Sequence, residues 1–300
     1  MTSFAVVLPH CRLSIDADDR LAGRGLAAAV AAHLAVMFGG LGAAAQEQPV
    51  SALPCGGDAI ARGAAGRIVD GRTFALEDGR EVRLAAIEVP PLAAPGEARE
   101  AEAAPGGVAA KDALAALLEG ADIVLRRADA AADRYGRILA YTSTAREGIE
   151  RSVQADLLAG GFARVGGRIG TRECATELLA RERAARKAKL GLWAISYYDL
   201  LDADNPADVQ AKRGRFALVE GKVVSVRESG ATIYVNFGRR WTEDFTVTIL
   251  KRNERSFAAA GVEPKRLSGR RVRVRGWIEE RGGPWIEATR PEQIELIDRE

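Results

Sequence analysis

The sequence predicts a mixed α+β protein, mainly β, that consists of two small β-barrels, the first with helices packed on it. Short runs of alternating apolar and polar residues recur along the chain and are separated by Asp-Gly, Gly-Gly and similar turn sequences. Helical spacing is confined to a few segments, all but one of them before residue 195. With 300 residues, of which 47% are hydrophobic, the chain is long enough for two domains with cores of their own.

The first 45 residues have the pattern of a signal peptide. An apolar run over 26–41 follows Arg20 and Arg24 and precedes three alanines at 43–45. We therefore expect cleavage between Ala45 and Gln46, a periplasmic or secreted protein, and no integral membrane domain after cleavage. The alternative is an uncleaved N-terminal membrane anchor.

Export would change what the histidines and cysteines of the chain indicate. Both histidines of the chain lie in this leader, so the mature protein would have no imidazole for a catalytic triad or a zinc site. Cys55 and Cys174 would remain in an oxidising compartment, where they are candidates for a disulfide. The alternative is two free buried thiols.

After an irregular tail over 46–64, the stretch 66–91 is predicted to form strands joined by tight turns. Turns are expected at Asp70-Gly71 and Asp78-Gly79, because glycine accepts a positive φ without steric cost. Arg83 and Glu88 bracket an apolar run at the end of the last strand. They are either a solvated strand edge or a phosphate-binding cation and a metal ligand.

The next elements alternate between helices and strands. A surface loop over 92–107 precedes a helix at 108–118 that stops at Gly120. The remaining predicted elements up to residue 195 are short strands at 123–125 and 138–142 and helices at 152–159 and 171–190.

A polar linker is expected at 196–213, and a second β-rich unit follows over 214–300. Its alternation predicts five strands, with a short helix between the third and the fourth. This is the element order of an oligonucleotide-binding barrel. The strands are expected at 216–226, 232–237, 245–250, 271–279 and 285–288, and the helix at 253–260.

Four short motifs occur in a specific order: Asp70-Gly71-Arg72-Thr73, the strand end from Arg83 to Pro91, Asp133-Arg134-Tyr135-Gly136-Arg137, and Gly191-Leu192-Trp193. Together they resemble the staphylococcal nuclease (thermonuclease) family over residues 65–195. The resemblance implies a five-stranded oligonucleotide-binding barrel with packed helices. It also implies hydrolysis of nucleic-acid phosphodiesters with Ca²⁺ as cofactor.

The resemblance also implies roles for individual residues. Arg83 and Arg137 match the two arginines that stabilise charge on the phosphate, a task that suits the planar, always charged guanidinium. Tyr135 matches a tyrosine that helps hold a terminal phosphate. Glu88 and Asp70 are the remaining candidates for metal ligands.

Two positions depart from the family pattern. Arg72 replaces a calcium-binding aspartate, and Pro91 replaces the glutamate that activates water. Glutamates in the loop after Pro91 are possible substitutes. The sequence therefore leaves three alternatives open. The protein is an active nuclease with an altered site, a pseudonuclease that binds nucleic acid or phosphorylated ligands with the help of Arg72, or an envelope module for protein interactions.

In the second unit, Arg271, Arg273 and Arg275 alternate with valines, so one strand face is predicted to be all arginine. Together with Trp241, this face suits single-stranded DNA or RNA, because arginines follow the backbone and aromatic rings stack on bases. The alternative is a solvated outer face of a small barrel with its tryptophans in the core. The net charge of +2 gives no further support for nucleic acid, and any basic surface must be a local patch.

Overall fold

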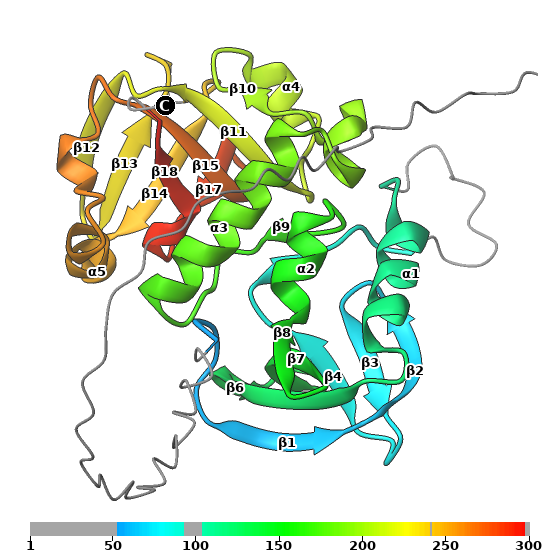
Figure 1. Cartoon of the computed structure of the whole chain (residues 1–300). Coiled ribbons are helices and arrows are strands. Elements are labelled where there is room, and N and C mark those ends of the chain that lie inside the picture. The colour runs from blue at the N-terminus through cyan, green and yellow to red at the C-terminus, as the bar shows by residue number, and fades with distance from the viewer. Residues whose placement is uncertain (1–52, 93–103, 241, 298–300) are drawn as a thin grey trace, which may run out of the picture. The chain divides into compact units, whose positions relative to one another are not determined.

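The computed structural model describes residues 53–92, 104–240 and 242–297 (Figure 1). The predicted signal peptide and Trp241 lie outside these residues. Residues 48–300 form one compact unit with a mixed α+β fold. Within the described ranges, no helix has the length and apolarity needed to cross a membrane.

A seven-stranded sheet forms the first β region. Its strands follow the order β1-β6-β7-β4-β3-β2, with β8 paired to β7, and β4 and β7 are parallel. The two end strands of this path are separated in sequence only by Ala64, so one chain segment forms both edges of the sheet. The strands are β1 (Ala59–Gly63), β2 (Ala65–Asp70), β3 (Thr73–Leu76), β4 (Glu81–Leu84), β6 (Asp122–Ala132), β7 (Ile138–Arg146) and β8 (Ile149–Ser152).

The sheet has more strands than the predicted five-stranded barrel. The extra strand β1 lies in the segment predicted to be an irregular tail, and it pairs with β6. The short strands β5 (Ile87–Glu88) and β9 (Arg164–Val165) form a separate antiparallel pair.

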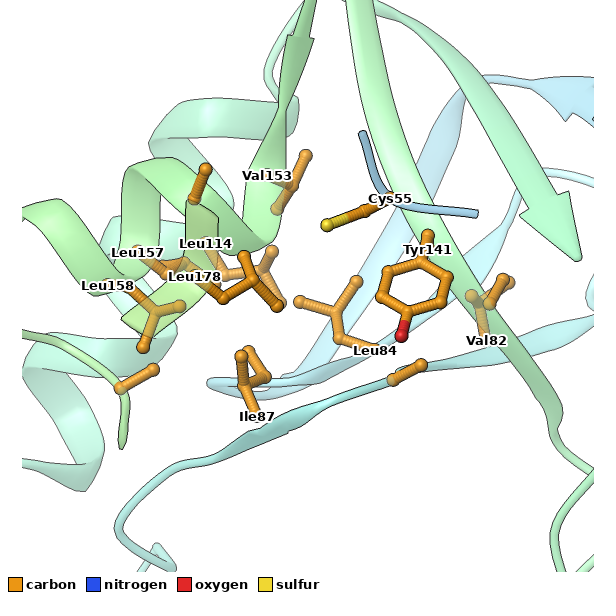
Figure 2. Packing of buried hydrophobic residues seen from close by; sticks show 14 of the residues in the cluster. Cys55, Val82, Leu84, Ile87, Leu114, Tyr141, Val153, Leu157, Leu158 and Leu178 are labelled. Atoms are coloured by element: carbon orange, nitrogen blue, oxygen red, sulfur yellow. The ribbon is translucent and has the colours of Figure 1, made fainter. Parts of the chain in front are cut away.

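Three helices pack on the first β region, close to the predicted boundaries. They are α1 (Gly107–Leu118), α2 (Val153–Ala159) and α3 (Arg172–Lys187). Ser152 and Thr171 cap α2 and α3, since each hydroxyl accepts a hydrogen bond from the backbone N–H three residues later. Leucines of the three helices meet Val82 and Leu84 of β4 in the core (Figure 2).

The 3₁₀-helix η1 (Gly191–Ala194) follows α3 and contains the Gly-Leu-Trp motif. Gly191 has a φ of 52°, and a Cβ atom at this position would lie 2.5 Å from the carbonyl oxygen of Gly161. Glycine is therefore required here, because only glycine allows the backbone of the α2 end to approach so closely.

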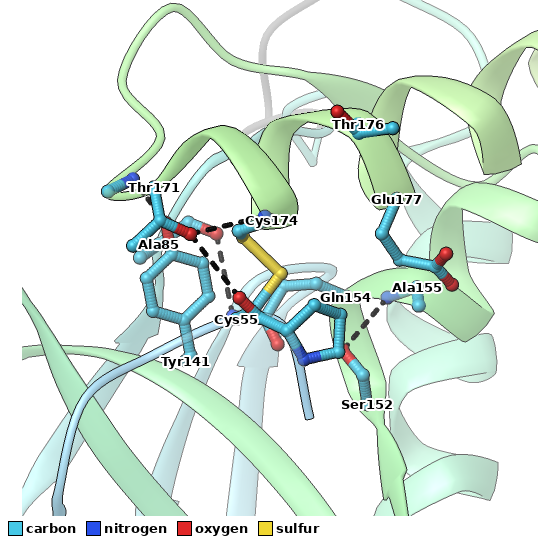
Figure 3. The surroundings of a disulfide bond; sticks show 12 residues. Cys55, Ala85, Tyr141, Ser152, Gln154, Ala155, Thr171, Cys174, Thr176 and Glu177 are labelled. Carbon is cyan, nitrogen blue, oxygen red and sulfur yellow. Dashed lines mark hydrogen bonds between the residues drawn. A yellow bond between two sulfur atoms is a disulfide. The ribbon is translucent and has the colours of Figure 1, made fainter. Parts of the chain in front are cut away.

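A disulfide joins Cys55 to Cys174, as predicted (Figure 3). Both residues are buried, and the bond closes a sequence separation of 119 residues. It fastens the segment before β1 to the first turn of α3. The Thr171 hydroxyl, which caps this turn, also donates a hydrogen bond to the carbonyl oxygen of Pro54, 3.4 Å away.

The second β region contains two sheets. One has the order β10-β11-β15-β18 and the other the order β12-β13-β14-β17-β16. The strands are β10 (Leu201–Asp202), β11 (Phe216–Lys222), β12 (Ser225–Ser229), β13 (Thr232–Asn236), β14 (Thr246–Leu250), β15 (Arg271–Trp277), β16 (Glu279–Arg281), β17 (Gly283–Glu287) and β18 (Ile294–Leu296). Helix α5 (Glu254–Ala259) and the 3₁₀-helices η3 (Lys251–Asn253), η4 (Pro264–Arg266) and η5 (Pro291–Gln293) connect them.

Two of the predicted long strands are each divided in two, 216–226 into β11 and β12, and 271–279 into β15 and β16. Phe237, Phe245 and Phe257 are fully or almost fully buried in the core of this region. The assignment of this region to the oligonucleotide-binding fold stays a prediction.

Residues 196–213 do not form the predicted linker. They contain the 3₁₀-helix η2 (Ser196–Tyr198), strand β10 and helix α4 (Pro206–Gln210), and β10 pairs with β11. Ala203 and Val209 of this segment are buried in the core of the second β region. The prediction failed because a few well-placed apolar residues anchor a segment whose composition is mostly polar.

The two β regions are in direct contact. Ala185 and Trp193 of the first pack with Phe216 and Leu218 of β11. The buried guanidinium of Arg164 donates a hydrogen bond to the carbonyl oxygen of Phe216 at 2.7 Å. These contacts hold the loop that follows β9 next to the second region.

Candidate phosphate-binding cleft

Three arginines from adjacent parts of the first sheet converge on one site. Arg72 lies in the turn between β2 and β3, Arg83 lies in β4, and Arg137 directly precedes β7. Because β4 is hydrogen-bonded to both β3 and β7, the sheet brings these three positions together. The structure thus places the sequence-predicted arginines side by side.

Arg83 is the cation of this site that has no ion-pair partner among the described residues. Its side chain is half-buried, and this burial lowers its pKa, as do the nearby charges of Arg72 and Arg137. Glu88 and Asp70 act in the opposite direction but do not cancel the effect. A half-buried guanidinium between two other cations is a site that a bound anion would stabilise.

Arg72 binds both of the side chains that were predicted as metal ligands. Its Nη1 lies 2.5 Å from Oε2 of Glu88 and also donates a hydrogen bond to the carbonyl oxygen of Ile87 at 3.0 Å. Its backbone N–H donates to Oδ1 of Asp70 at 2.8 Å, which closes the turn. Both carboxylates are therefore occupied by the residue that replaces the family's aspartate.

These residues do not fit a calcium ion. Ca²⁺ takes six to eight oxygen ligands, usually with several carboxylates. No group of three or more Asp, Glu, His or Cys side chains suited to a metal occurs in the described part of the chain. The glutamates at 97, 100 and 102 lie outside the described residues. Pro91 is exposed and has no side-chain proton acceptor.

Arg137 and Tyr135 are organised by Asp133. The carboxylate of Asp133 accepts hydrogen bonds from the Arg137 side chain at 2.7 Å and from the backbone N–H groups of Tyr135 and Arg137. Burial raises the pKa of Asp133, but these hydrogen bonds outweigh it and lower the pKa overall. The Tyr135 ring is 68% exposed and lies against the guanidinium of Arg137 at 5.1 Å. It is available to a ligand at the edge of the site.

A cleft of about 510 Å³ opens from Arg72, Arg83 and Glu88 towards the second β region. Its far side includes Trp277 and Arg290. Sequence reasoning did not place these two residues in this cleft, because they come from segments more than 190 positions after Arg83 and no local pattern relates them to it.

The predicted arginine face of β15 is not exposed. Arg273 and Arg275 are buried, and only Arg271 at the strand end is exposed. Arg275 forms ion pairs with Glu182 of α3, at 2.5 Å, and with Glu295 of β18. The alternation is as predicted, but α3 and β18 supply carboxylates to the arginine face and remove it from solvent.

Arg273 and Arg271 also have carboxylate partners. Both pair with Glu220 of the neighbouring strand β11, at 3.0 Å and 3.1 Å. Burial lowers the pKa of Arg275, but Glu182 and Glu295 outweigh it and raise the pKa overall. This cluster is therefore an internal ion-pair network and not an open nucleic-acid surface.

Comparison with known families gives one match. The family model for the staphylococcal nuclease homologue matches residues 81–195, which include Arg83, Glu88, Tyr135 and Arg137. A comparison with curated proteins finds no match.

Proposed function

Because residues 81–195 form a domain of the staphylococcal nuclease family, we propose that the protein binds nucleic-acid phosphate groups in the cleft around Arg83 and does not cleave them by the calcium-dependent route. The observation that carries this proposal is Arg83 itself. It is half-buried, it lies beside two other guanidiniums, and it forms no ion pair among the described residues.

A phosphate would satisfy this arrangement. The guanidinium offers parallel N–H donors that match two phosphate oxygens, and a charge-assisted hydrogen bond contributes about 1.5–3 kcal/mol. The negative charge would also relieve the repulsion among Arg72, Arg83 and Arg137. Tyr135 at the edge supplies an exposed ring and hydroxyl for the remainder of the nucleotide.

Cleavage by the family's route is disfavoured by the two replaced residues. The ion pair between Arg72 and Glu88 neutralises a carboxylate that Ca²⁺ would need. Without a base in the position of Pro91, activation of water loses about 10²–10⁴-fold in rate. Binding without hydrolysis therefore agrees best with the side chains present.

We also propose that the protein is exported, with cleavage between Ala45 and Gln46. The disulfide between Cys55 and Cys174 supports this, because disulfides persist in oxidising compartments. The mass of the protein purified from cells tests it. A mass that corresponds to residues 46–300 supports cleavage, and the mass of the full chain overturns it.

The test of binding uses the full-length protein and a 5′-phosphorylated mononucleotide, with the unphosphorylated nucleoside as a comparison ligand. We expect Arg83→Ala to raise the mononucleotide Kd by about 10- to 100-fold, the equivalent of one charge-assisted hydrogen bond. Arg266→Ala is the matched control, since Arg266 is an exposed arginine that pairs with Glu263 in the second β region. Equal Kd values for the wild type and Arg83→Ala would contradict the proposal.

Cleavage is measured in parallel on single-stranded DNA and RNA, with Ca²⁺ and with chelator. We expect no calcium-dependent cleavage. Calcium-dependent cleavage that disappears in Arg83→Ala would show that the protein is a nuclease after all, with a ligand and a base outside the described residues.

A further inference from the structure

A second group of arginines lies next to the cleft. Arg168, Arg252 and Arg290 line a depression of about 490 Å³. Its other lining residues are neutral and polar: Asn253, Ser256 and Thr289. Arg168 and Arg290 also line the cleft around Arg83, so the depression continues the cleft.

These arginines differ from those of β15 in their surroundings. All three are exposed, and none of the residues that line the depression is acidic. Arg290 lies 3.5 Å from Asp129, a contact between two side chains that are each 48% exposed. Arg168 and Arg252 form no ion pair among the described residues. The depression therefore gathers three positive charges, and the carboxylates beside Arg290 are Asp129, in a weak and solvated ion pair, and the partly buried Glu292.

Gln293 lies beside the backbone that carries two of these arginines. Arg168 follows Gly167, where a Cβ atom would lie 3.1 Å from the side chain of Gln293. The Gln293 amide oxygen accepts a hydrogen bond from the backbone N–H of Arg290 at 3.1 Å. One buried glutamine thus orders the Arg290 turn and leaves little room for a side chain at position 167, next to Arg168.

Trp277 supplies an aromatic surface to the cleft, which residues of both arginine groups also line. It is 51% exposed, and its ring meets Phe216 edge-to-face, with the centroids 6.2 Å apart. An exposed ring of this kind is a stacking surface for a base, and base stacking is independent of sequence.

We propose that Arg168, Arg252 and Arg290 form a second phosphate-binding site, and that the ligand of the whole cleft is a single strand of nucleic acid. Its backbone passes from Arg83 over Trp277 to the three arginines. The proposal rests on the proposed function for its first contact, at Arg83. A mononucleotide occupies the Arg83 site alone, whereas a strand of several nucleotides occupies both sites.

The test measures binding of full-length protein to fluorescent thymidine oligonucleotides of about 4, 8 and 16 residues by anisotropy, in chelator. The 5′-phosphorylated mononucleotide is the short ligand. We expect affinity to rise sharply at the length that spans both sites. Arg252→Ala should weaken binding of the long oligonucleotide about tenfold and leave mononucleotide binding unchanged. The slope of log K against log salt should fall by about 0.7 for each lost phosphate contact.

Arg266→Ala is again the matched control. Equal oligonucleotide affinities for Arg252→Ala, Arg168→Ala and Arg266→Ala would overturn the second site. Equally tight, Arg252-dependent binding of duplex DNA would overturn the choice of a single strand. If Arg252→Ala weakens oligonucleotide binding and Arg83→Ala changes neither ligand, the second site stands and the proposed function fails.

Discussion

Each β region of this protein contains a set of three arginines, and the two sets serve different purposes. In the first region, Arg83 lies in a cleft without an ion-pair partner among the described residues. In the second, Arg275 is completely enclosed and pairs with Glu182 and Glu295. Both sets lie on or beside β-strands, and both appear in the sequence as possible nucleic-acid contacts.

The difference comes from what packs on each set. Helix α3 brings Glu182 onto Arg275 across a separation of 93 residues, and β18 adds Glu295. No carboxylate within ion-pairing distance reaches Arg83 from the described residues. An arginine in a strand is therefore a binding residue or a structural residue according to the charges on the neighbouring elements.

The largest expected effect on stability comes from removal of the disulfide in the first β region. Loss of the disulfide in Cys174→Ala should lower the free energy of unfolding by roughly 4–5 kcal/mol, the chain-entropy value for a loop of about 100 residues. Urea denaturation measures this. Cys55→Ala and the double variant should lose about as much as the single variant if the bond is the cause, and a clearly larger loss in the double variant would contradict it.

Disruption of the ion-pair network around Arg275 should destabilise the protein almost as much. Arg275→Ala leaves Glu182 and Glu295 buried without their main partner, which costs about 3–5 kcal/mol. Arg271→Ala is the control, since it removes an exposed arginine from the same strand and should cost less than about 1 kcal/mol. Equal losses of stability in the two variants would remove the distinction between the two arginine sets.

A charge reversal at Arg72 should create a metal site next to Glu88. Arg72→Asp removes the partner of Glu88 and adds a carboxylate, so Ca²⁺ should stabilise this variant. At ten times its Kd, calcium adds about 1.4 kcal/mol to the free energy of unfolding. Arg67→Asp makes the same charge change on strand β2 and is the control. Thermal unfolding with and without Ca²⁺ gives the result, and an unresponsive Arg72→Asp would show that the resemblance to the nuclease site does not extend to its ligand geometry.

The smallest expected effect is the response of the network to acid. Burial raises the pKa of Glu295, but the charge and hydrogen bond of Arg275 outweigh it and lower the pKa overall. A lowered pKa means that the stabilisation is present above the unfolded value of about 4.3 and is lost as the pH falls through the folded value.

Glu295→Gln should therefore lose less stability than the wild type between about pH 5 and pH 3. Urea midpoints at a series of pH values measure this, with exposed Glu77→Gln as the control. An acid response in Glu295→Gln identical to that of the wild type would contradict the assignment.

Local sequence patterns predicted most of the first region. The helices predicted at 152–159 and 171–190 and the turn at Asp70-Gly71 depend on chemistry within a few residues, and the structure has all three, although α3 ends at Lys187 and not at Gly191. The pairing of Cys55 with Cys174 followed from elimination, because only two cysteines remain after the predicted leader. The convergence of Arg72, Arg83 and Arg137 followed from the family resemblance.

Long-range contacts account for what the sequence did not predict. Burial of Arg275 depends on Glu182, and the order in 196–213 depends on docking of Val209 into the second core. The proposed second phosphate-binding site brings Arg168 of the first β region together with Arg252 and Arg290 of the second. No local period relates such positions, so only the three-dimensional structure brings them together.

The pairing of Glu182 with Arg275 also limits how the protein can be divided. Residues 81–195, which match the family model, include Glu182 and the apolar side chains of Ala185 and Trp193. A chain cut after residue 195 would expose that apolar patch and leave Glu182 without its cation. Although the nuclease-like domain is recognisable as a unit in sequence, we expect that transferring it to another protein would require redesign of the α3 surface.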